Sequence, residues 1–456
     1  MEKLTIEEII TSVKGEIIKK NFLNDIEFIS TDSRDIRNNT LFISLVGEKF
    51  DGHNFIKECY EKGSRAFIIE KDIDIEYEDI TLIKVPNTLY ALGDIAKFYR
   101  NKFDVEVIGV TGSVGKTSTK DIIHSVLSKK YNTLKNEGNF NNEIGLPKTI
   151  FNISSLNEYA VLEMGMDHKG QIKHMADIAH PVIGVISNIG SAHIEFFDSK
   201  DGIFDAKMEI TTYFDENSLL IINGDDSYLK TLLSKEHKYK ILSYGFNHYN
   251  DIYPLEYKIN DDNSTFTCLI NNKKEYFTIP SPAKHNILNA LSAILIGLYK
   301  EVPLDKIKEG LSTFTLSKSR MDIFKTDKYK IINDTYNASL DSVVAGLEVL
   351  KNNNTRRVAI LGDIFEVGKF EETIHREIGK HIKGNADILV TVGNASKYIL
   401  ESALEEGFDK NNTYHYVDRF SLLKEIDNIV KENDTILIKA SNGMKLEEVS
   451  NYFRNL

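Results

Sequence analysis

A glycine-rich turn has the residue types and spacing of a loop that binds nucleotide phosphates. It lies in Val107-Ile-Gly-Val-Thr-Gly-Ser-Val-Gly-Lys-Thr-Ser-Thr119, between an apolar β-branched run and a helical pattern. Glycines let the backbone curl so that its N–H groups point inward, and a helix N-terminus adds partial positive charge. We expect Lys116 to reach the terminal phosphates and the Thr117 hydroxyl to hold Mg²⁺. The strict pattern has glycine where Val110 stands, so a tight turn that merely contains a lysine remains the alternative. The residues expected around the phosphates are Gly112, Ser113, Val114, Gly115, Lys116, Thr117 and Ser118.

Two further residues follow apolar strand candidates and could act beside this loop. Glu163 ends the run at 159–163, and His193 follows the run at 182–187. A carboxylate at a strand end beside a phosphate loop is a natural Mg²⁺ ligand, and a histidine in the same position is a candidate ligand. The alternatives are a solvated strand-end acid and a structural histidine.

Lys207 and several asparagines carry weaker signals. Lys207 lies on an apparent helix and, by itself, is typical of a solvated surface lysine. Asn142 belongs to a cluster with Asn139 and Asn141, which is either a plain loop or a source of amide donors to a phosphate or carbonyl oxygen. Asn286 and Asn289 open a buried helical pattern, where they could cap the helix or recognise an adenine ring.

Polar residues in the last part of the chain could face a ligand between domains, and those of the first part are either plain turns or candidate binding residues. The last part offers Arg320, Asp334, Tyr336 and Asn337, together with the acid-bearing loop at 362–368. The first part offers turn-like segments, with the candidate residues Ser33, Arg34, Asp51 and His53.

The elements that must position these residues alternate between strands and helices. Such alternation favours parallel sheets covered by helices, with functional residues beyond the carboxyl ends of the strands. Residues 250–280 break the rhythm and indicate a β-rich insertion. We predict an α/β fold of three domains, with boundaries at 1–101, 102–315 and 316–456. In this order, the three domains are a smaller N-terminal α/β domain, a central parallel-sheet domain with the phosphate loop (P-loop), and a C-terminal Rossmann-like α/β domain.

The composition narrows the class of protein. The chain has 456 residues and a formal net charge of −12, which argues against nonspecific nucleic-acid binding and against an anionic membrane surface. Two cysteines far apart indicate reduced thiols in the cytoplasm rather than a disulfide framework. The charged, amphipathic N-terminus is unlike a signal peptide, and no stretch predicts membrane insertion.

Taken together, these segments resemble the Mur ligase family over nearly the whole chain. The specific elements are Thr-Gly-Ser-Val-Gly-Lys-Thr-Ser at 111–118, Asn-Asn-Glu-Ile-Gly-Leu-Pro at 141–147, Glu-Met-Gly at 163–165, Asn-Ile-Gly-Ser-Ala-His at 188–193 and His-Asn-Ile-Leu-Asn-Ala at 285–290. Asp-Ser-Arg at 32–34, Asp-Gly-His at 51–53 and Tyr-Asn-Ala at 336–338 also resemble the family.

The resemblance implies an ATP-dependent, ADP-forming ligase of peptidoglycan precursor synthesis, monomeric and cytoplasmic. Its substrates would be UDP-N-acetylmuramoyl-tripeptide and D-alanyl-D-alanine, joined through an acyl phosphate. It assigns catalysis to Lys116, Asn142, Glu163, His193 and Lys207. Two Mg²⁺ ions would be held by Thr117, Glu163, His193 and Lys207, the last as a carbamate. ATP would also contact Asn286, Asn289, Arg320 and Asp334, and the other substrates Ser33, Arg34, Asp51, His53, Tyr336 and Asn337.

The last domain departs from the family pattern at three places. Asn333-Asp-Thr-Tyr-Asn-Ala-Ser-Leu340 replaces Asp-Asp-Ser-Tyr-Asn-Ala-Asn-Pro, Ser319 replaces a glycine, and Lys439-Ala-Ser-Asn-Gly-Met444 lacks the usual arginine. These changes leave two alternatives open. One is a related ligase, such as the member that adds the third peptide residue or one that extends folate with glutamate. The other is a regulatory paralogue that binds nucleotide or muropeptide.

Overall fold

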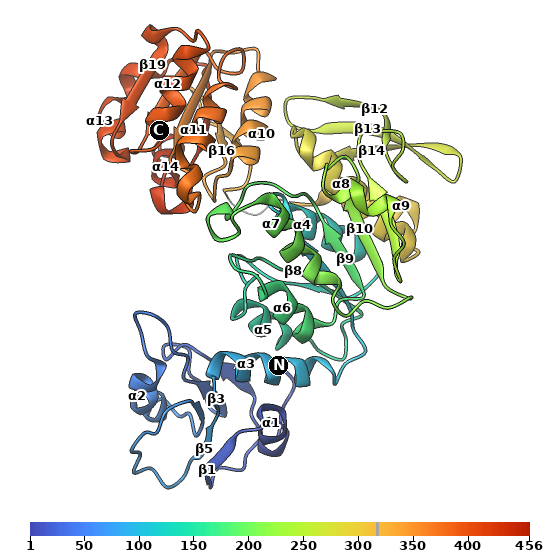
Figure 1. The fold of residues 1–456 in the computed structure, drawn as a ribbon, viewed down its shortest axis with the longest axis vertical. Coiled ribbons are helices and arrows are strands. Elements are labelled where there is room, and N and C mark those ends of the chain that lie inside the picture. Colours follow the sequence, from blue (N-terminus) through green and yellow to red (C-terminus); the bar gives the residue numbers. More distant parts are fainter. Residues whose placement is uncertain (316–318) are drawn as a thin grey trace.

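A computed structural model describes residues 1–315 and 319–456, which form three α/β units in a row (Figure 1). The N-terminal unit (blue) lies at one end, the central unit (green to yellow) in the middle, and the C-terminal unit (orange to red) at the other end. The α/β fold class predicted from the sequence is confirmed. The predicted boundary between residues 315 and 316 lies at the edge of the described residues, since Leu316 is outside them.

The N-terminal unit is built on a five-stranded sheet of order β1-β5-β4-β3-β2. Strands β2 to β5 are parallel, and β1 pairs antiparallel with β5. The carboxyl ends of β2 to β5 therefore lie at one edge of the sheet. The elements are α1 (Ile6–Val13), β1 (Glu16–Lys20), β2 (Phe28–Ser30), β3 (Thr40–Ile43), η1 (Gly52–Phe55), α2 (Ile56–Glu61), β4 (Ala66–Ile69), β5 (Thr81–Lys84) and α3 (Thr88–Arg100).

The central unit contains a six-stranded parallel sheet of order β11-β10-β9-β6-β8-β7. Strand β6 lies between β9 and β8, so the loop that leaves β6 is flanked by the carboxyl ends of both neighbours. The elements up to β9 are β6 (Glu106–Thr111), α4 (Lys116–Leu127), β7 (Thr133–Lys135), α5 (Gly145–Ile150), β8 (Tyr159–Glu163), α6 (Gln171–Ala179) and β9 (Ile183–Ile186). After β9 come η2 (Ile194–Phe196), α7 (Lys200–Met208), η3 (Glu209–Thr211), β10 (Leu219–Asn223), η4 (Leu229–Ser234) and β11 (Lys240–Tyr244).

The predicted β-rich insertion is an antiparallel sheet of order β12-β13-β14, followed by two helices. The elements are β12 (Pro254–Ile259), β13 (Ser264–Ile270), β14 (Lys273–Ile279), α8 (Lys284–Tyr299) and α9 (Leu304–Thr313). Apolar residues on nearly all sides of α8 are buried, and α8 packs against α4. None of the helices in the described part of the chain is long and apolar enough to cross a membrane.

The C-terminal unit holds a six-stranded sheet of order β15-β16-β20-β17-β18-β19. Only β15 is antiparallel to its neighbour. The elements up to β18 are β15 (Asp322–Lys325), β16 (Lys330–Asn333), α10 (Leu340–Lys351), β17 (Arg357–Gly362), η5 (Gly368–Phe370), α11 (Glu371–Gly379) and β18 (Ile388–Val392). The remainder is α12 (Lys397–Glu405), η6 (Lys410–Asn412), β19 (Thr413–Tyr416), α13 (Arg419–Ile429), β20 (Thr435–Lys439), η7 (Asn442–Met444) and α14 (Glu447–Arg454).

Candidate active site

The glycine-rich turn connects β6 to the start of α4, as the sequence predicts. Gly115 precedes the helix with a φ of 84°, and no side chain caps the helix N-terminus. The first N–H groups of α4 therefore have no acceptor within the helix and can bind an anion. Lys116 folds back so that its ammonium donates to the carbonyl oxygen of Gly112 at 2.9 Å. Burial lowers the pKa of Lys116.

Two residues after β9 brace this turn; the sequence marked Asn188 only as part of a family motif and assigned neither residue a role. The Asn188 Oδ1 atom accepts from the N–H groups of Ser113 and Val114, at 3.1 and 2.9 Å. The Ser187 hydroxyl donates to the carbonyl oxygen of Val114 at 2.6 Å. A Cβ atom at Gly112, whose φ is 150°, would overlap the Ser187 hydroxyl oxygen. Glycine is thus required at position 112 by both backbone conformation and space.

Thr117 and Glu163 meet at the predicted magnesium site. The Thr117 hydroxyl donates to Glu163 Oε2 at 2.7 Å, and Asn141 Nδ2 donates to Glu163 Oε1 at 2.7 Å. Both residues are about 1% exposed. Among the described residues no three His, Cys, Asp or Glu side chains gather as a metal cluster. Hydroxyl and carboxylate oxygens nevertheless fit Mg²⁺, which usually takes one or two carboxylates and completes its shell with phosphate and water.

Asn136 fixes the main chain of Glu163, a role that the sequence analysis missed. Its Oδ1 atom accepts from the Glu163 N–H at 2.9 Å, and its Nδ2 atom donates to the Glu163 carbonyl oxygen at 3.0 Å. The same Nδ2 atom donates to the Phe140 carbonyl oxygen at 2.8 Å. Lys120, itself buried, donates to the carbonyl oxygen of Asn136 at 2.7 Å. A lone asparagine in a loop carries no periodic signal that could have identified it.

Lys207 is buried rather than solvated. It lies near the end of α7, whose N-terminus is capped by Ser199, and its side chain is buried with the residue 2% exposed. Within the described part of the chain its ammonium has no hydrogen-bond or ion-pair partner. Burial lowers the pKa of Lys207 well below its ordinary value, and the nearby charge of Lys116 lowers it further. An unpaired buried ammonium is costly, so this lysine is suited to be neutral or chemically modified.

The His193 side chain contacts the C-terminal unit, whereas the family resemblance placed it at a metal ion shared with Lys207. Its backbone has a left-handed φ of 62°, and its Nδ1 atom lies 2.6 Å from Glu366 Oε2. The two side chains therefore interact as a close pair. The His193 contact lowers the pKa of Glu366. Glu366 belongs to the acid-bearing loop noted in the sequence, although nothing in the sequence paired it with His193.

A cavity of about 540 Å³ lies between the central and C-terminal units, with Leu89 of α3 at its edge. It brings together most of the sequence-predicted residues of these two units. Those lining it are Ser113, Val114, Gly115, Lys116, Ser118, Asn142, Glu163, His193, Asn286, Arg320, Asp334, Tyr336 and Asn337. Those that do not line it are Gly112, Thr117, Lys207, Asn289, Ser33, Arg34, Asp51 and His53.

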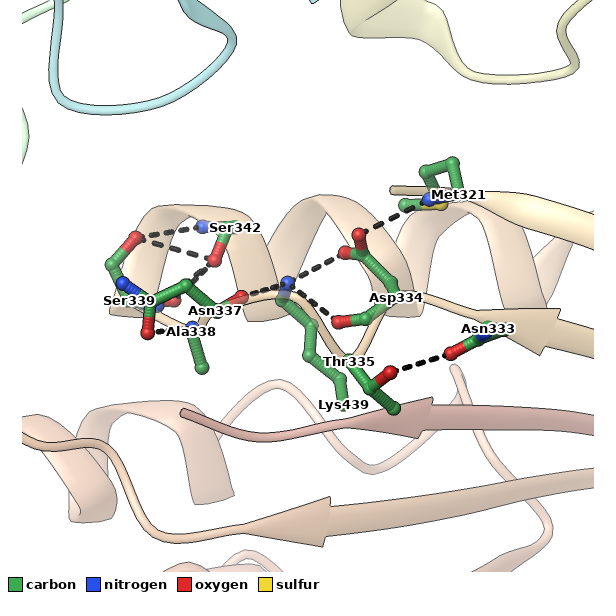
Figure 2. Close-up of polar contacts among 9 residues, drawn as sticks. All are labelled: Met321, Asn333, Asp334, Thr335, Asn337, Ala338, Ser339, Ser342 and Lys439. Carbon is green, nitrogen blue, oxygen red and sulfur yellow. Dashed lines mark hydrogen bonds and ion pairs between the residues drawn. The ribbon is translucent and has the colours of Figure 1, made fainter. Parts of the chain in front are cut away.

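The wall contributed by the C-terminal unit is organised by a buried ion pair (Figure 2). Lys439, the last residue of β20, reaches between Asp334 and Asn337, with its ammonium 2.5 Å from Asp334 Oδ2 and 2.9 Å from the Asn337 carbonyl oxygen. The Arg320 guanidinium lies over the Tyr336 ring at 3.8 Å and forms no ion pair with the described residues. Arg320 is therefore available to an anionic ligand.

The three predicted asparagines have structural contacts. Asn142 Oδ1 accepts from the N–H groups of Ile144 and Gly145 at the start of α5. Asn286 and Asn289 do not cap α8, because Ala283 is the residue that precedes the helix. They bond to each other at 2.9 Å, and the Thr119 hydroxyl donates to Asn289 at 3.1 Å. Asn286 and Asn289 thus connect α8 to α4, the helix that follows the phosphate loop.

The candidates of the N-terminal unit follow the carboxyl ends of β2 and β3. The Arg34 guanidinium pairs with Asp32 at 2.7 Å, while Ser33 lies between them in the same turn. Asp51 Oδ1 lies 2.6 Å from His53 Nδ1, and Asp51 also pairs with Lys71. Lys148 of α5, in the central unit, acts electrostatically on the Asp32 carboxylate.

The departures of the last domain are accommodated locally. Ser319 adopts a left-handed φ of 59°, a conformation that favours glycine, and its hydroxyl donates to Glu447 at 2.9 Å. Ser339 caps α10 in a reciprocal arrangement with Ser342. Asn442, at the position of the usual arginine, donates to the Tyr336 carbonyl oxygen at 3.1 Å.

Comparison with known proteins gives matches along the whole chain. Residues 25–100 match the "Mur ligase family, catalytic domain", residues 110–297 the "Mur ligase middle domain", and residues 319–442 the "Mur ligase, glutamate ligase domain". The UDP-N-acetylmuramoyl-tripeptide–D-alanyl-D-alanine ligase of Bacillus subtilis is 38% identical over 98% of both chains. The enzyme of the same name from Escherichia coli is 30% identical over 98% of both chains.

Solved structures give the same picture. A crystal structure of MurF from Acinetobacter baumannii is 27% identical, with a TM-score of 0.92 over 100% of both chains. MurF ligase from Thermotoga maritima in complex with ADP is 26% identical, with a TM-score of 0.84 over 94% of this chain and 97% of that one.

Proposed function

The chain belongs to the Mur ligase family, and we propose that it joins D-alanyl-D-alanine to UDP-N-acetylmuramoyl-tripeptide. The reaction consumes ATP and gives UDP-N-acetylmuramoyl-pentapeptide, ADP and phosphate, a step in the synthesis of peptidoglycan precursors. Full-length similarity to ligases of that name supports the choice of both substrates. The enzyme acts as a cytoplasmic monomer.

The first step joins two anions, so positive charge must surround them. The tripeptide carboxylate attacks the γ-phosphate of ATP, the bond to the β,γ-bridging oxygen breaks, and an acyl phosphate and ADP are formed. Lys116 turns from the Gly112 carbonyl oxygen to the phosphates, and the free N–H groups at the start of α4 bind the same oxygens. Arg320, which has no carboxylate partner among the described residues, adds charge from the C-terminal unit.

The second step is attack by the dipeptide amine on the acyl carbon. The tetrahedral oxyanion collapses, phosphate leaves, and an amide bond remains. Asn142 lines the cavity and can direct its amide toward the carbonyl oxygen. Tyr336 and Asn337, from the C-terminal unit, would contact the dipeptide. Most of the rate must come from positioning, because three substrates meet between three units.

We assign two Mg²⁺ ions to this site, one held by Thr117 and Glu163 and the other by His193 and a carbamate on Lys207. The ions supply charge that stabilises the transferring phosphoryl group. Two observations support the assignment: the short contact of Thr117 with Glu163, and the burial of Lys207 without a hydrogen-bond or ion-pair partner among the described residues. A lysine with an ordinary pKa near 10.4 is almost fully protonated at neutral pH and cannot take up carbon dioxide. The lowered pKa of Lys207 removes that obstacle.

The three units would divide the substrates between them. The boundaries are 1–101, 102–315 and 316–456. The N-terminal unit binds the UDP-sugar at the edge that carries Ser33, Arg34, Asp51 and His53, where Lys148 of α5 acts on the charge of Asp32. The central unit binds ATP, with Asn286 at the cavity wall and Asn289 behind it. The C-terminal unit brings the amine, and Asp334 helps to shape the nucleotide contacts.

The observation that carries the proposal is the burial of Lys207, which has no partner in residues 1–315 and 319–456 and is influenced by the charge of Lys116. Phosphate release should require ATP, UDP-N-acetylmuramoyl-tripeptide and D-alanyl-D-alanine together. Lys207→Ala should lose turnover, and a small added carboxylate such as acetate should restore part of it. Lys200→Ala on the same helix serves as the control and should keep activity.

The outcomes separate the competing functions. Release with a single amino acid in place of the dipeptide would identify another ligase of the family. No release with any pair of substrates would leave a binding or regulatory role. Full activity of Lys207→Ala would contradict the role of that lysine.

A further inference from the structure

One loop of the central unit touches both the phosphate loop and the C-terminal unit. It comprises residues 188–198 after β9, and we call it the bridging loop. On its inner side, Asn188 holds the N–H groups of Ser113 and Val114, as described above. Two residues later, the Gly190 N–H donates to the Ser113 hydroxyl at 2.8 Å. The start of the bridging loop and the phosphate loop therefore move together.

On its outer side, the bridging loop receives Asp341 from the first turn of α10. The Ser191 N–H donates to Asp341 Oδ2 at 3.2 Å. A Cβ atom at Gly190 would overlap the same carboxylate oxygen and would lie 3.1 Å from the Ser113 Cβ. The missing side chain at Gly190 thus creates the space in which Asp341 approaches the phosphate loop.

The far end of the bridging loop is held by the loop after β17. The Glu195 N–H donates to the Glu366 carbonyl oxygen at 3.3 Å, and Lys369 pairs with Asp198 at 3.2 Å. A Cβ atom at Gly368 would lie 2.9 Å from Glu195 Cγ. Here again a glycine permits the approach of the two units, so the C-terminal unit is fitted to the bridging loop at both ends.

We propose that Asp341 is a positioning residue. It couples the docking of the C-terminal unit to the conformation of the phosphate loop, through Gly190, Ser191 and Ser113. The inference rests on the proposed function in one respect, namely that the C-terminal unit brings the amine. When the C-terminal unit docks on the central unit, the Asp341 carboxylate fixes the Gly190–Ser191 backbone. The Gly190 N–H then holds the Ser113 hydroxyl of the phosphate loop in place. The phosphate loop reaches its working geometry only when the unit that carries the amine is in place.

A double-mutant cycle at Gly190 and Asp341 tests this coupling. Gly190→Ala puts a methyl group where the carboxylate must sit, so kcat should fall by about 30-fold while KM for the UDP-linked substrate stays within about twofold. Asp341→Ala should lower kcat by about fivefold. The double variant lacks the obstructing carboxylate and should be at least about fivefold more active than the product of the two single losses predicts. Losses that simply multiply would overturn the proposal.

Two further variants separate positioning from damage to the helix. Asp341→Asn keeps an acceptor for the Ser191 N–H and should stay within about twofold of the parent enzyme. Asp305→Ala removes an exposed first-turn acid from α9, and should leave kcat unchanged. Equal losses for Asp341→Asn and Asp341→Ala would overturn the positioning role, and so would a loss for Asp305→Ala as large as that for Asp341→Ala.

A binding measurement makes the test independent of the substrates. Calorimetry with ADP and Mg²⁺ should show weaker binding to Gly190→Ala and to Asp341→Ala, and the double variant should bind more tightly than the product of the two single losses predicts. Circular dichroism checks that each variant is folded. If the parent enzyme binds ADP but does not ligate D-alanyl-D-alanine, the proposed function fails while the ADP cycle still decides the role of Asp341. Identical ADP affinity in all variants would overturn the coupling.

Discussion

Replacing Asn136 by alanine should disable the carboxylate of Glu163 without touching that residue. The change removes three side-chain hydrogen bonds, two to the Glu163 main chain and one to the Phe140 carbonyl oxygen. At a net 0.5–1.5 kcal/mol each, the loss of folding free energy is about 3 kcal/mol. Because Asn136 is 1% exposed, water does not replace the lost partners without rearrangement.

The catalytic effect should exceed what the stability loss explains. A displacement of about 1 Å at a reacting centre costs on the order of 100-fold in rate, so we expect kcat to fall by about that factor. The Mg²⁺ concentration needed for half-maximal rate should rise, because the Glu163 carboxylate is no longer held in place. Phosphate release at varied Mg²⁺ measures both effects, and calorimetry with ADP and Mg²⁺ measures binding without turnover.

Asn250→Ala is the matched control in the same unit. Asn250 is 5% exposed, and its Nδ2 atom donates to Asp225 and to the Asn247 carbonyl oxygen, both at 2.9 Å. Its loss should destabilise the protein by about 2 kcal/mol and leave the Mg²⁺ dependence unchanged. The reasoning is refuted if Asn136→Ala is destabilised like this control but retains the parent kcat and Mg²⁺ dependence.

Two other changes have defined outcomes. Lys439→Met leaves the Asp334 carboxylate, which is mostly buried, without its cation, and should lower the free energy of unfolding by about 3–5 kcal/mol; the double variant with Asp334→Asn should lose less in urea unfolding, and an equal loss would contradict the ion-pair argument. The Lys71 ammonium, together with the side chain and the backbone N–H of His53, lowers the pKa of Asp51 to about 2. The ordinary value is near 3.9. A carboxyl group with a depressed pKa stabilises the fold above its unfolded pKa and loses that effect as the pH falls through its folded pKa. The thermal midpoint should therefore fall more steeply between about pH 4 and 2 in the parent protein than in Asp51→Asn, and parallel curves would argue against this linkage.

The strands buried on both faces were the easiest elements to predict. The runs at 159–163 and 182–187 correspond to β8 and β9, with bounds that agree to within one residue. Such strands read as continuous apolar runs. The edge strand β1, with the exposed sequence Glu-Ile-Ile-Lys-Lys, and β19, with Thr-Tyr-His-Tyr, carry no such signal. They were not predicted.

The site divides in the same way. The phosphate loop and its pairing partner Glu163 follow from local sequence, since a turn and a strand end mark them. The sequence around Lys207 is typical of a surface lysine, whereas the structure buries its side chain. Asn136, Asn188 and Glu366 act through residues distant in sequence, so only the packing of strands and units brings out their roles.

The buried pair of Lys439 with Asp334 has a consequence for the order in which the protein is made. Strand β20 lies between β16 and β17, although it follows β17, β18 and β19 in the sequence. While residues 435–439 are still inside the ribosome, this sheet has a gap at its centre, and Asp334 lacks its Lys439 partner. Units fold one after another from the N-terminus during synthesis. The phosphate loop can therefore form before its facing wall, and that wall is complete only once residues 435–439 have left the ribosome.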